Sequence, residues 1–340
     1  MKRRRQWAVL ITAAALLSGC SGHQDSAEDQ DQSQAAAERP STDPKSTPPS
    51  APALPEGMLH LGSSFPFREE GQSDSWKVSV SALSSAKPSA KASSIPDGWR
   101  ALTTKVTFTN TDSGIAELHG SLDVTAHYGP EGRTAAVFTD TDVKGLAFPD
   151  VETHPIRVRP GGTYTTTVGY AVPADTAGQP LTFTIEGDDP TYIEGAIPGA
   201  PARPVDTSHV QPVDTAKELK FGDWEEDDPW LRIGQPRAAG TTAQGKRYAV
   251  DLSFFNNFDD TLLGQRPEAN LKVYAGAELT EGDFEENLSN LPSLAWIAPQ
   301  RMATVTGHFT IPAKQIEGSV SIEVVDPYGE DVTYTGDVKN

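Results

Sequence analysis

The sequence has 340 residues, a formal net charge of −19 at pH 7 and one cysteine, Cys20. A chain this acidic is a poor ligand for nucleic acid or an anionic lipid surface, because its own field repels polyanions. Since a lone cysteine cannot form an intrachain disulfide, the domains must be held together by hydrophobic cores, and the length favours two domains.

The N-terminus, residues 1–19, is interpreted as a lipoprotein signal peptide. Four basic residues, 2–5, precede an apolar run from Trp7 to Leu17 that only Thr12 interrupts, and small residues follow. This order is typical of a secretory signal. The run would give about 16 Å of helix, whereas a bilayer core needs roughly 20 apolar residues, so a membrane span is a poor interpretation.

The tetrapeptide Leu17-Ser18-Gly19-Cys20 resembles the lipobox of bacterial lipoproteins. The resemblance implies that the Cys20 thiol receives a diacylglyceryl group and that the signal is cut just before it. Cys20 is then the lipid attachment residue, and the mature chain is anchored on the extracellular face of the cell membrane. Loss of the four basic residues changes the net charge from −19 to −23. The alternative is a plain signal peptide with a chance cysteine.

Two stretches separate the remaining chain into parts. Residues 20–56 are rich in Ser, Gln, Asp, Ala and Pro, and they predict a disordered tether because they cannot bury enough apolar surface to fold. Residues 198–216 contain four prolines and a doubled "PVDT", which predicts an extended linker that leaves the flanking parts partly independent. The parts are a first segment, 57–197, and a second segment, 217–340.

Both segments have the period-two alternation of β-strands with one buried face. The sequence therefore predicts an all-β fold. A short helix over Thr280–Leu291, "TEGDFEENLSNL", is the one exception, because a Thr or Asp cap precedes three apolar residues at helical spacing. The strand signals are alternating apolar residues at 76–82, 122–128, 164–172, 181–185, 248–254 and 320–324.

The two segments also resemble each other. Pro160 and Pro173 are 13 residues apart, as are Pro299 and Pro312, and each closing proline follows a strand-like run. Further landmarks match in the same order: "DSWKV" with "DPWLR", "KVTFTN" with "DLSFFN", and "LTFTI" with "VSIEV". We interpret this pattern as a tandem repeat of one β-sandwich.

At these residues the chain resembles a bacterial family of immunoglobulin-like domains of unknown function, common in lipoproteins of Gram-positive, actinobacterial type. Each resembling stretch has a strand that ends in Asn, and a later Pro-Gly-Gly that starts a strand ending in Val-Pro. The first segment fits with Pro160-Gly161-Gly162, but the second has Pro299-Gln300-Arg301 and lacks the glycines. The resemblance implies two tandem telokin-like sandwiches and assigns no activity.

Motifs for catalysis are missing from the sequence: it contains no Gly-x-Ser-x-Gly, His-Glu-x-x-His, phosphate-loop or dinucleotide fingerprint. We therefore predict a non-enzyme with no catalytic residues, no cofactor and no metal ligands. A Ser-His-Asp arrangement stays open, because triad members can be distant in sequence. His119 and His127 share one parity and could bind a metal, but we expect two solvated surface histidines.

Acidic runs at predicted strand ends are the remaining candidates for a site. The runs at 186–190, 222–230 and 326–331 could supply oxygen ligands to Ca²⁺, although none has the EF-hand spacing, and solvated turns are the preferred interpretation. Trp224 and Trp230 in the second run could form an exposed aromatic rim. By analogy with Trp76, we expect Trp230 in the core instead.

The leading functional hypothesis is a surface lipoprotein that binds a protein, peptide or envelope component without catalysis. It follows from the predicted order of anchor, tether and two β-domains. Three alternatives are kept: a solute-binding lipoprotein of a transporter, which would need helices around a cleft; a Ca²⁺-stabilised adhesion module; and an envelope hydrolase. The sequence predicts contact with the membrane through the lipid and no nucleic-acid partner.

Overall fold

A computed structural model describes most of the chain after residue 51. The described residues are 52–90, 92, 94–118, 124–138, 142–143, 146, 155–213, 219–226, 229–258, 270–276, 279–285, 296–312, 319–325 and 331–338. The described residues all belong to one compact unit by their contacts. The predicted signal peptide and Cys20 lie outside the described residues. In the described part, no helix is long and apolar enough to cross a membrane.

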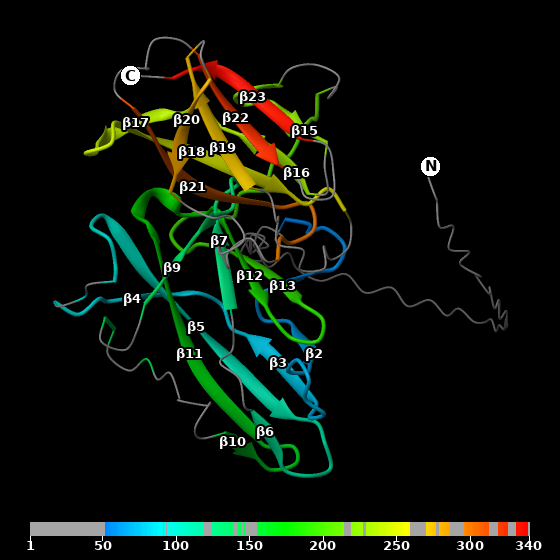
Figure 1. Cartoon of the computed structure of the whole chain (residues 1–340). Coiled ribbons are helices and arrows are strands. Elements are labelled where there is room, and N and C mark those ends of the chain that lie inside the picture. The colour runs from blue at the N-terminus through cyan, green and yellow to red at the C-terminus, as the bar shows by residue number, and fades with distance from the viewer. Residues whose placement is uncertain are drawn as a thin grey trace, which may run out of the picture. The chain divides into compact units, whose positions relative to one another are not determined.

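The fold is all-β, as predicted, and strands account for nearly all of its regular structure (Figure 1). In the first segment the strands are β1 (Met58–His60), β2 (Ser64–Phe67), β3 (Trp76–Val80), β4 (Ser84–Ala86), β5 (Trp99–Asn110), β6 (Ala116–Leu118), β7 (Val124–Tyr128), β8 (Arg133–Thr134), β9 (Ala136–Val137), β10 (Ile156–Val158), β11 (Thr163–Pro173), β12 (Pro180–Ile185) and β13 (Thr191–Ala196). A single 3-10 turn, Ala174–Thr176, joins β11 to β12.

The second segment also consists of strands in its described part. They are β14 (Leu219–Lys220), β15 (Trp224–Glu225), β16 (Trp230–Ile233), β17 (Arg237–Thr241), β18 (Lys246–Phe255), β19 (Asn270–Ala275), β20 (Thr280–Phe284), β21 (Met302–Ile311), β22 (Ser319–Val325) and β23 (Val332–Asp337). The helix predicted over Thr280–Leu291 is therefore wrong in its first half, because β20 pairs with β19 and β21. These tertiary pairings outweigh the local helical pattern. Residues 286–291 lie outside the described part.

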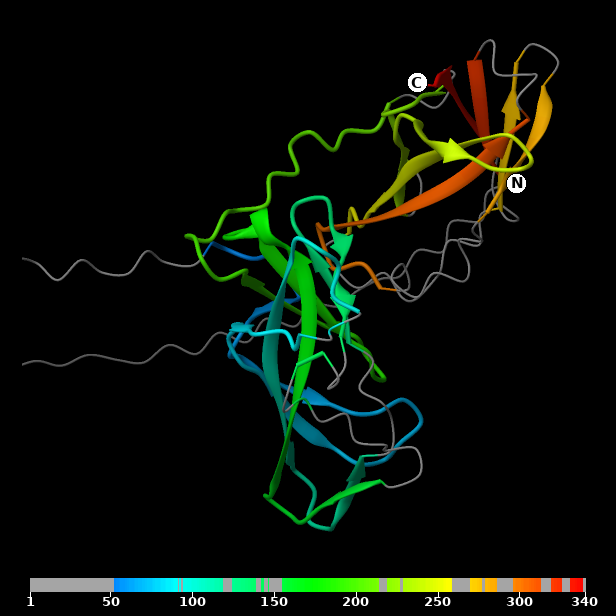
Figure 2. The same ribbon diagram turned by 90° about the vertical axis from the view of Figure 1, so that its left-hand side faces the viewer.

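Two large hydrogen-bonded sheets and a small two-stranded one, β6-β10, make up the described part of the first segment. One has the order β1-β13-β12-β7-β8, and the other has the order β2-β3-β5-β11-β9 with β4 also on β5. The long strands β5 and β11 run antiparallel, side by side, over their whole lengths (Figures 1 and 2). Alternate residues of both sheets point into a shared core, which is the arrangement of a β-sandwich.

Nearly every strand pairing of the first segment recurs in the second. The parallel pair β1–β13 corresponds to β14–β23, and the antiparallel pairs β3–β5, β5–β11 and β7–β12 correspond to β16–β18, β18–β21 and β19–β22. Among the described strands of the first segment, only the small β6–β10 pair has no counterpart. The matched landmarks of the sequence thus fall on matched strands.

The same turn closes the long hairpin of each segment. Asn110 and Asn256 are both buried, and each donates its Nδ2 to a backbone carbonyl, of Val158 at 2.8 Å and of Ile297 at 2.9 Å. The backbone carbonyl of each asparagine accepts the N–H of the residue after the matched proline, from Gly161 at 3.1 Å and from Gln300 at 3.0 Å. Gln300 adopts the positive φ of Gly161, 52° against 66°, so the missing glycine leaves the turn unchanged.

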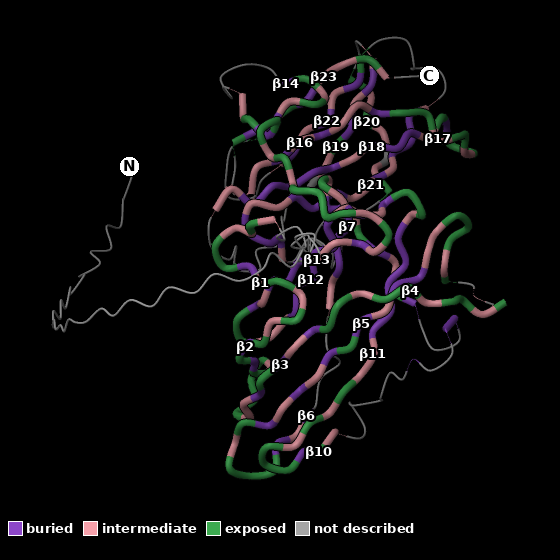
Figure 3. The backbone as a smooth tube through the Cα atoms, turned by 180° about the vertical axis from the view of Figure 1, so that it is seen from behind, coloured by how far each residue is buried: buried purple, intermediate pink, exposed green. Residues whose placement is uncertain are grey.

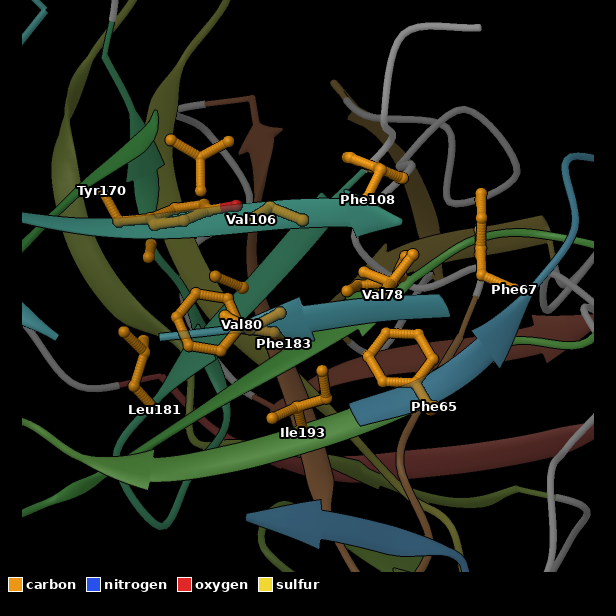
Figure 4. Packing of buried hydrophobic residues seen from close by; sticks show 14 of the residues in the cluster. Phe65, Phe67, Val78, Val80, Val106, Phe108, Tyr170, Leu181, Phe183 and Ile193 are labelled. Carbon is orange, nitrogen blue, oxygen red and sulfur yellow. The ribbon is translucent and has the colours of Figure 1, made fainter. Parts of the chain in front are cut away.

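Separate hydrophobic clusters fill the two segments. The larger cluster spans residues 65–197 and includes Trp76, Phe108, Tyr170 and Phe183; Figure 4 shows part of it around Phe183. A second cluster spans residues 219–334. Burial of such side chains contributes roughly 25 cal/mol per Å², and it is the main stabilising term of a chain without disulfides.

Direct contacts join the two segments. The turn between β7 and β8 reaches β21, where the Thr304 N–H donates to the Gly132 carbonyl at 3.0 Å and Thr304 pairs in parallel with Arg133. Arg133 also forms an ion pair with Asp251 on β18, at 2.8 Å. Arg301 forms a bidentate pair with Glu194, at 2.6 and 2.9 Å, and both side chains are about nine-tenths buried.

Further contacts hold the ends of the described part of the linker. Arg100 donates to the Pro198 carbonyl at 2.8 Å, and the Arg203 N–H donates to the Gly178 carbonyl at 2.8 Å. At the other end Val210 is buried beside Trp224. The linker residues 198–213 are described. They form no strand, and Pro212 makes an isolated bridge with Trp224.

Candidate functional site

The candidate site is the outer face of the sheet formed by β2, β3, β5 and β11, at the end opposite β9. Along β2, β3 and most of β5, buried residues alternate with exposed or half-buried ones, and on β11 the exposed Thr163 and Thr165 continue the outward set (Figure 3). We call this outward set the hydroxyl face. It consists of Ser64, Pro66, Lys77, Ser79, Thr103, Lys105, Thr107, Thr109, Thr163, Thr165 and Thr167.

The hydroxyl face ends where a small apolar cluster covers the same sheet. Phe138, Val143 and Leu146 are buried there with Ala101 and Ala171. A β-carbon on Gly169 would overlap the Phe138 ring, so glycine lets that ring lie directly on the strand. One end of the sheet is therefore closed by the chain itself, and at the threonine-rich end Thr163 and Thr165 are exposed.

Threonines pair across the two long strands of this face. Thr109 lies opposite Thr163, Thr107 opposite Thr165 and Lys105 opposite Thr167. The Thr107 and Thr165 hydroxyls are 3.0 Å apart and share a hydrogen bond. Threonine has high β-propensity and keeps donors and acceptors on a pleated surface, so the sequence produces both the strands and the polar array.

The electrostatics of this face differ from those of the whole chain. The chain carries 47 acidic residues among 340, yet β2, β3, β5 and β11 contain none. Lys77 and Lys105 are exposed on the hydroxyl face. The face is therefore a neutral to basic surface on a strongly acidic protein, and it favours neutral or acidic groups of a partner.

An open hollow of about 590 Å³ adjoins the β2 end of this face. Ser64, Pro66, Lys77 and Thr111 line it on the sheet side. Asp188 and Asp189, from the acidic run predicted at 186–190, line the opposite rim. Arg68 joins the two sides, because it lies 3.9 Å from the Asp188 carboxylate and its carbonyl accepts the Asp188 N–H at 3.1 Å.

The described part of the chain was expected to lack metal ligands, and its acidic side chains are dispersed. No group of three or more His, Cys, Asp or Glu side chains there could hold a metal ion. The acidic run at 186–190 lies in a turn, whereas most of the run at 326–331 lies outside the described residues. The hydroxyl face can thus donate and accept hydrogen bonds and present positive charge, which is the chemistry of binding.

The histidine prediction is wrong for one residue and outside the described part for the other. His127 is only 6% exposed, not solvated. It lies opposite Thr134 and Thr182, on the sheet face that also holds Glu194, and the second segment covers that face through Arg301. Burial arises from the contact between segments, which alternation along one strand does not reveal. His119 lies outside the described residues.

The tryptophans of the acidic run do not form an exposed rim. Trp224 is 3% exposed and packs edge-on against Phe255, with the Arg232 guanidinium 4.8 Å from its ring centroid. Trp230 is half-buried and also contacts Phe255. Trp230 was expected in the core; it packs against a small cluster with Val210 and Met302, but it stays half-buried and lies outside the main core.

Comparison with known proteins identifies no family. No family model matches the chain, and no curated protein sequence matches it. Among solved structures it is similar to an uncharacterized β-sandwich protein from Clostridium difficile 630, with 12% identity over 43% of this chain and 98% of that one and a TM-score of 0.26.

Two further similar structures are a secreted protein and a candidate lipoprotein. MPT63, a secreted protein from Mycobacterium tuberculosis, has 13% identity over 43% of this chain and 100% of that one, with a TM-score of 0.28. A candidate lipoprotein from Bacillus subtilis, ycdA, has 13% identity over 55% of this chain and 73% of that one, with a TM-score of 0.28.

Proposed function

We propose that this protein is a lipid-anchored module of the cell surface that binds a protein or peptide through its hydroxyl face, without catalysis. The observation that carries the proposal is the acid-free, hydroxyl-rich face with Lys77 and Lys105 on a chain of net charge −19. An exposed surface whose charge opposes that of the remaining protein directs a partner to one place.

The anchor is the first part of the proposal. Cys20 is the lipid attachment residue, and the two segments are immunoglobulin-like sandwiches displayed outside the membrane on the tether 20–56. The Leu17-Ser18-Gly19-Cys20 sequence supports this assignment. In Cys20→Ala, we expect metabolic lipid labelling to disappear and the protein to leave the membrane fraction. Persistent labelling of the variant would contradict the anchor.

A binding module explains the face better than the alternatives do. A transporter-type solute-binding protein would alternate strands with helices around a cleft, and the described part consists of strands with one 3-10 turn. A Ca²⁺-stabilised module would melt at a higher temperature with Ca²⁺ than with a chelator. We expect equal melting temperatures, and a rise with Ca²⁺ would favour that alternative.

Charge reversal on the face tests the binding function. Lys77 and Thr109 are cross-strand neighbours on the hydroxyl face, whereas Lys246 and Thr241 are an exposed cross-strand pair on the second segment. We expect Lys77→Glu with Thr109→Glu to abolish the major crosslinked adducts formed on intact cells. The matched pair Lys246→Glu with Thr241→Glu should leave them unchanged. Equal crosslinking by both double variants would refute the assignment of the face.

A further inference from the structure

The edge of β11 beside the hydroxyl face has backbone groups that point away from the sheet. The Gly162 carbonyl accepts the Asn110 N–H of β5, and the Gly169 carbonyl accepts the Phe138 N–H on the other side. Because N–H and C=O groups alternate between the two sides of an antiparallel strand, Thr163, Thr165 and Thr167 direct theirs outward. Among the described strands, none pairs with Thr163, Thr165 or Thr167 on this outward side.

Two other edges, those of β2 and β17, are protected. On β2, Pro66 lacks an N–H, and the next outward carbonyl, of Arg68, is taken by the Asp188 N–H. On β17 the pairing with β18 is irregular between Ala238 and Thr241. Pro, charges and bulges are the usual means of blocking an edge, and the β11 edge, "TYTTTV", has none of them.

The second segment shows what such an edge accepts. Thr304 precedes Pro312 by eight residues, as Thr165 precedes Pro173, so the two threonines occupy equivalent places on β21 and β11. The Thr304 N–H donates to the Gly132 carbonyl of the first segment. Thr304 is consequently 3% exposed, whereas Thr165 is exposed. One repeat thus binds a foreign strand at this edge, and its counterpart offers the same backbone groups.

The charge beside the edge is reversed between the repeats. In the second segment Asp251 lies opposite Thr306, and it binds Arg133 of the docked strand. In the first segment the residue opposite the equivalent Thr167 is Lys105, which is exposed, and no described residue forms an ion pair with it. A strand that docked here in the same way would therefore carry a carboxylate in the place of Arg133.

We infer that the β11 edge from Thr163 to Thr167 binds an extended segment of a partner protein, in parallel orientation, with an Asp or Glu side chain beside Lys105. The inference rests on the proposed function, and it names the mode of recognition, which is addition of a strand to a sheet edge. Backbone hydrogen bonds supply affinity in this mode, and the pairing of the carboxylate with Lys105 selects the segment.

Two synthetic peptides provide the probe. The first copies the docked strand of this chain, residues 128–134, "YGPEGRT", and the second carries Arg133→Glu in the same sequence. Binding to the full-length protein is measured by backbone amide shifts. We expect the glutamate peptide to bind at least fivefold more tightly than the arginine peptide, and Lys105→Glu to reverse this preference. Equal binding of both peptides, or no binding of either at millimolar concentration, would overturn the inference.

Two variants at Thr165 distinguish the contribution of the backbone N–H to binding from that of the side chain. Thr165→Pro removes an outward N–H while the hydrogen bonds to β5 remain. It should weaken binding of the glutamate peptide at least fivefold. Thr165→Ala keeps the N–H and should bind within twofold of the parent protein. If both variants behave alike, or if Thr165→Pro binds normally, the edge is not the site.

Amide exchange in the free protein is an independent test. The amides of Thr163, Thr165 and Thr167 should exchange quickly, and those of Tyr164 and Val168 slowly. Uniform protection would overturn the inference, because the edge would already be paired. If the protein forms a concentration-dependent dimer that Thr165→Pro abolishes, the edge binds a second copy of this chain and not a partner protein. The crosslinking test with Lys77 and Thr109 does not involve this edge, so the binding function can stand if edge recognition fails.

Discussion

Gly132 should be essential for the contact between the two segments. It lies in the turn between β7 and β8 with φ of +61°, and its carbonyl accepts the Thr304 N–H. A β-carbon at this position would overlap the backbone carbonyl of Met302. Backbone atoms cannot rotate away as a flexible side chain can. Gly132→Ala therefore requires the turn to separate from β21.

The magnitude follows from the contacts that this separation breaks. Any non-glycine residue at positive φ costs about 1–2 kcal/mol. Loss of the Gly132–Thr304 hydrogen bond adds about 1 kcal/mol, and weakening of the partly exposed Arg133–Asp251 pair adds up to about 1 kcal/mol. Gly132→Ala should then lower the free energy of unfolding by about 3 kcal/mol in total.

Gly161→Ala is the matched control. Gly161 has nearly the same φ, +66°, but nothing lies within 4 Å of an added β-carbon. The control should cost only the backbone term, and Gln300 shows that the equivalent turn accepts a side chain. Urea unfolding measures both variants. If Gly132→Ala and Gly161→Ala agree within about 0.5 kcal/mol, the contact does not constrain Gly132 and the reasoning is refuted.

Three further predictions concern buried polar groups. Arg301→Met should cost about 2–4 kcal/mol, because it leaves the buried Glu194 carboxylate with only the Thr182 hydroxyl, and adding Glu194→Gln should restore part of the loss in a double-mutant cycle. Asn256→Ala should cost about 2 kcal/mol by urea unfolding, since it leaves the buried Ile297 carbonyl unpaired; a cost near zero would contradict the role of that turn. Burial raises the pKa of Asp251, but hydrogen bonds from Arg133, Thr306 and Arg237 outweigh it and lower the pKa to about 2, below the usual 3.8. Its stabilising effect should be complete above about pH 5 and lost as the pH falls from 4 to 2; Asp251→Asn should remove this component of the pH dependence of unfolding.

Sequence patterns predicted the strands and their matching order because both depend on local chemistry. Alternation reveals the buried face of a strand, and the prolines and asparagines that bound the strands mark the turns. The pairing of Pro160 with Pro299 correctly aligned two turns, although Gln300 replaces a glycine there. A side chain at positive φ is uncommon, so the turn was recognisable only from its neighbours.

The contact between segments could not be predicted in this way. His127 and Thr304 follow the pattern of exposed strand residues, yet both are buried. Thr304 is covered by the turn at Gly132, which belongs to the other segment. The hydroxyl face was visible as threonines at alternate positions in "TTKVTFT" and "TYTTTV", but the sequence gives no sign of which alternate face is covered. At one end of the sheet the Phe138 ring lies on Gly169 and covers this face.

The docking of Gly132 against Thr304 has a consequence for how such chains lengthen by gene duplication. Each added copy would close the edge of its successor with its own turn, whatever the number of copies. The first copy would have no preceding copy, so its sheet edge would be the one in the array that no turn closes. In this chain the inferred binding edge belongs to the first segment, which is the copy that follows Cys20 in the sequence.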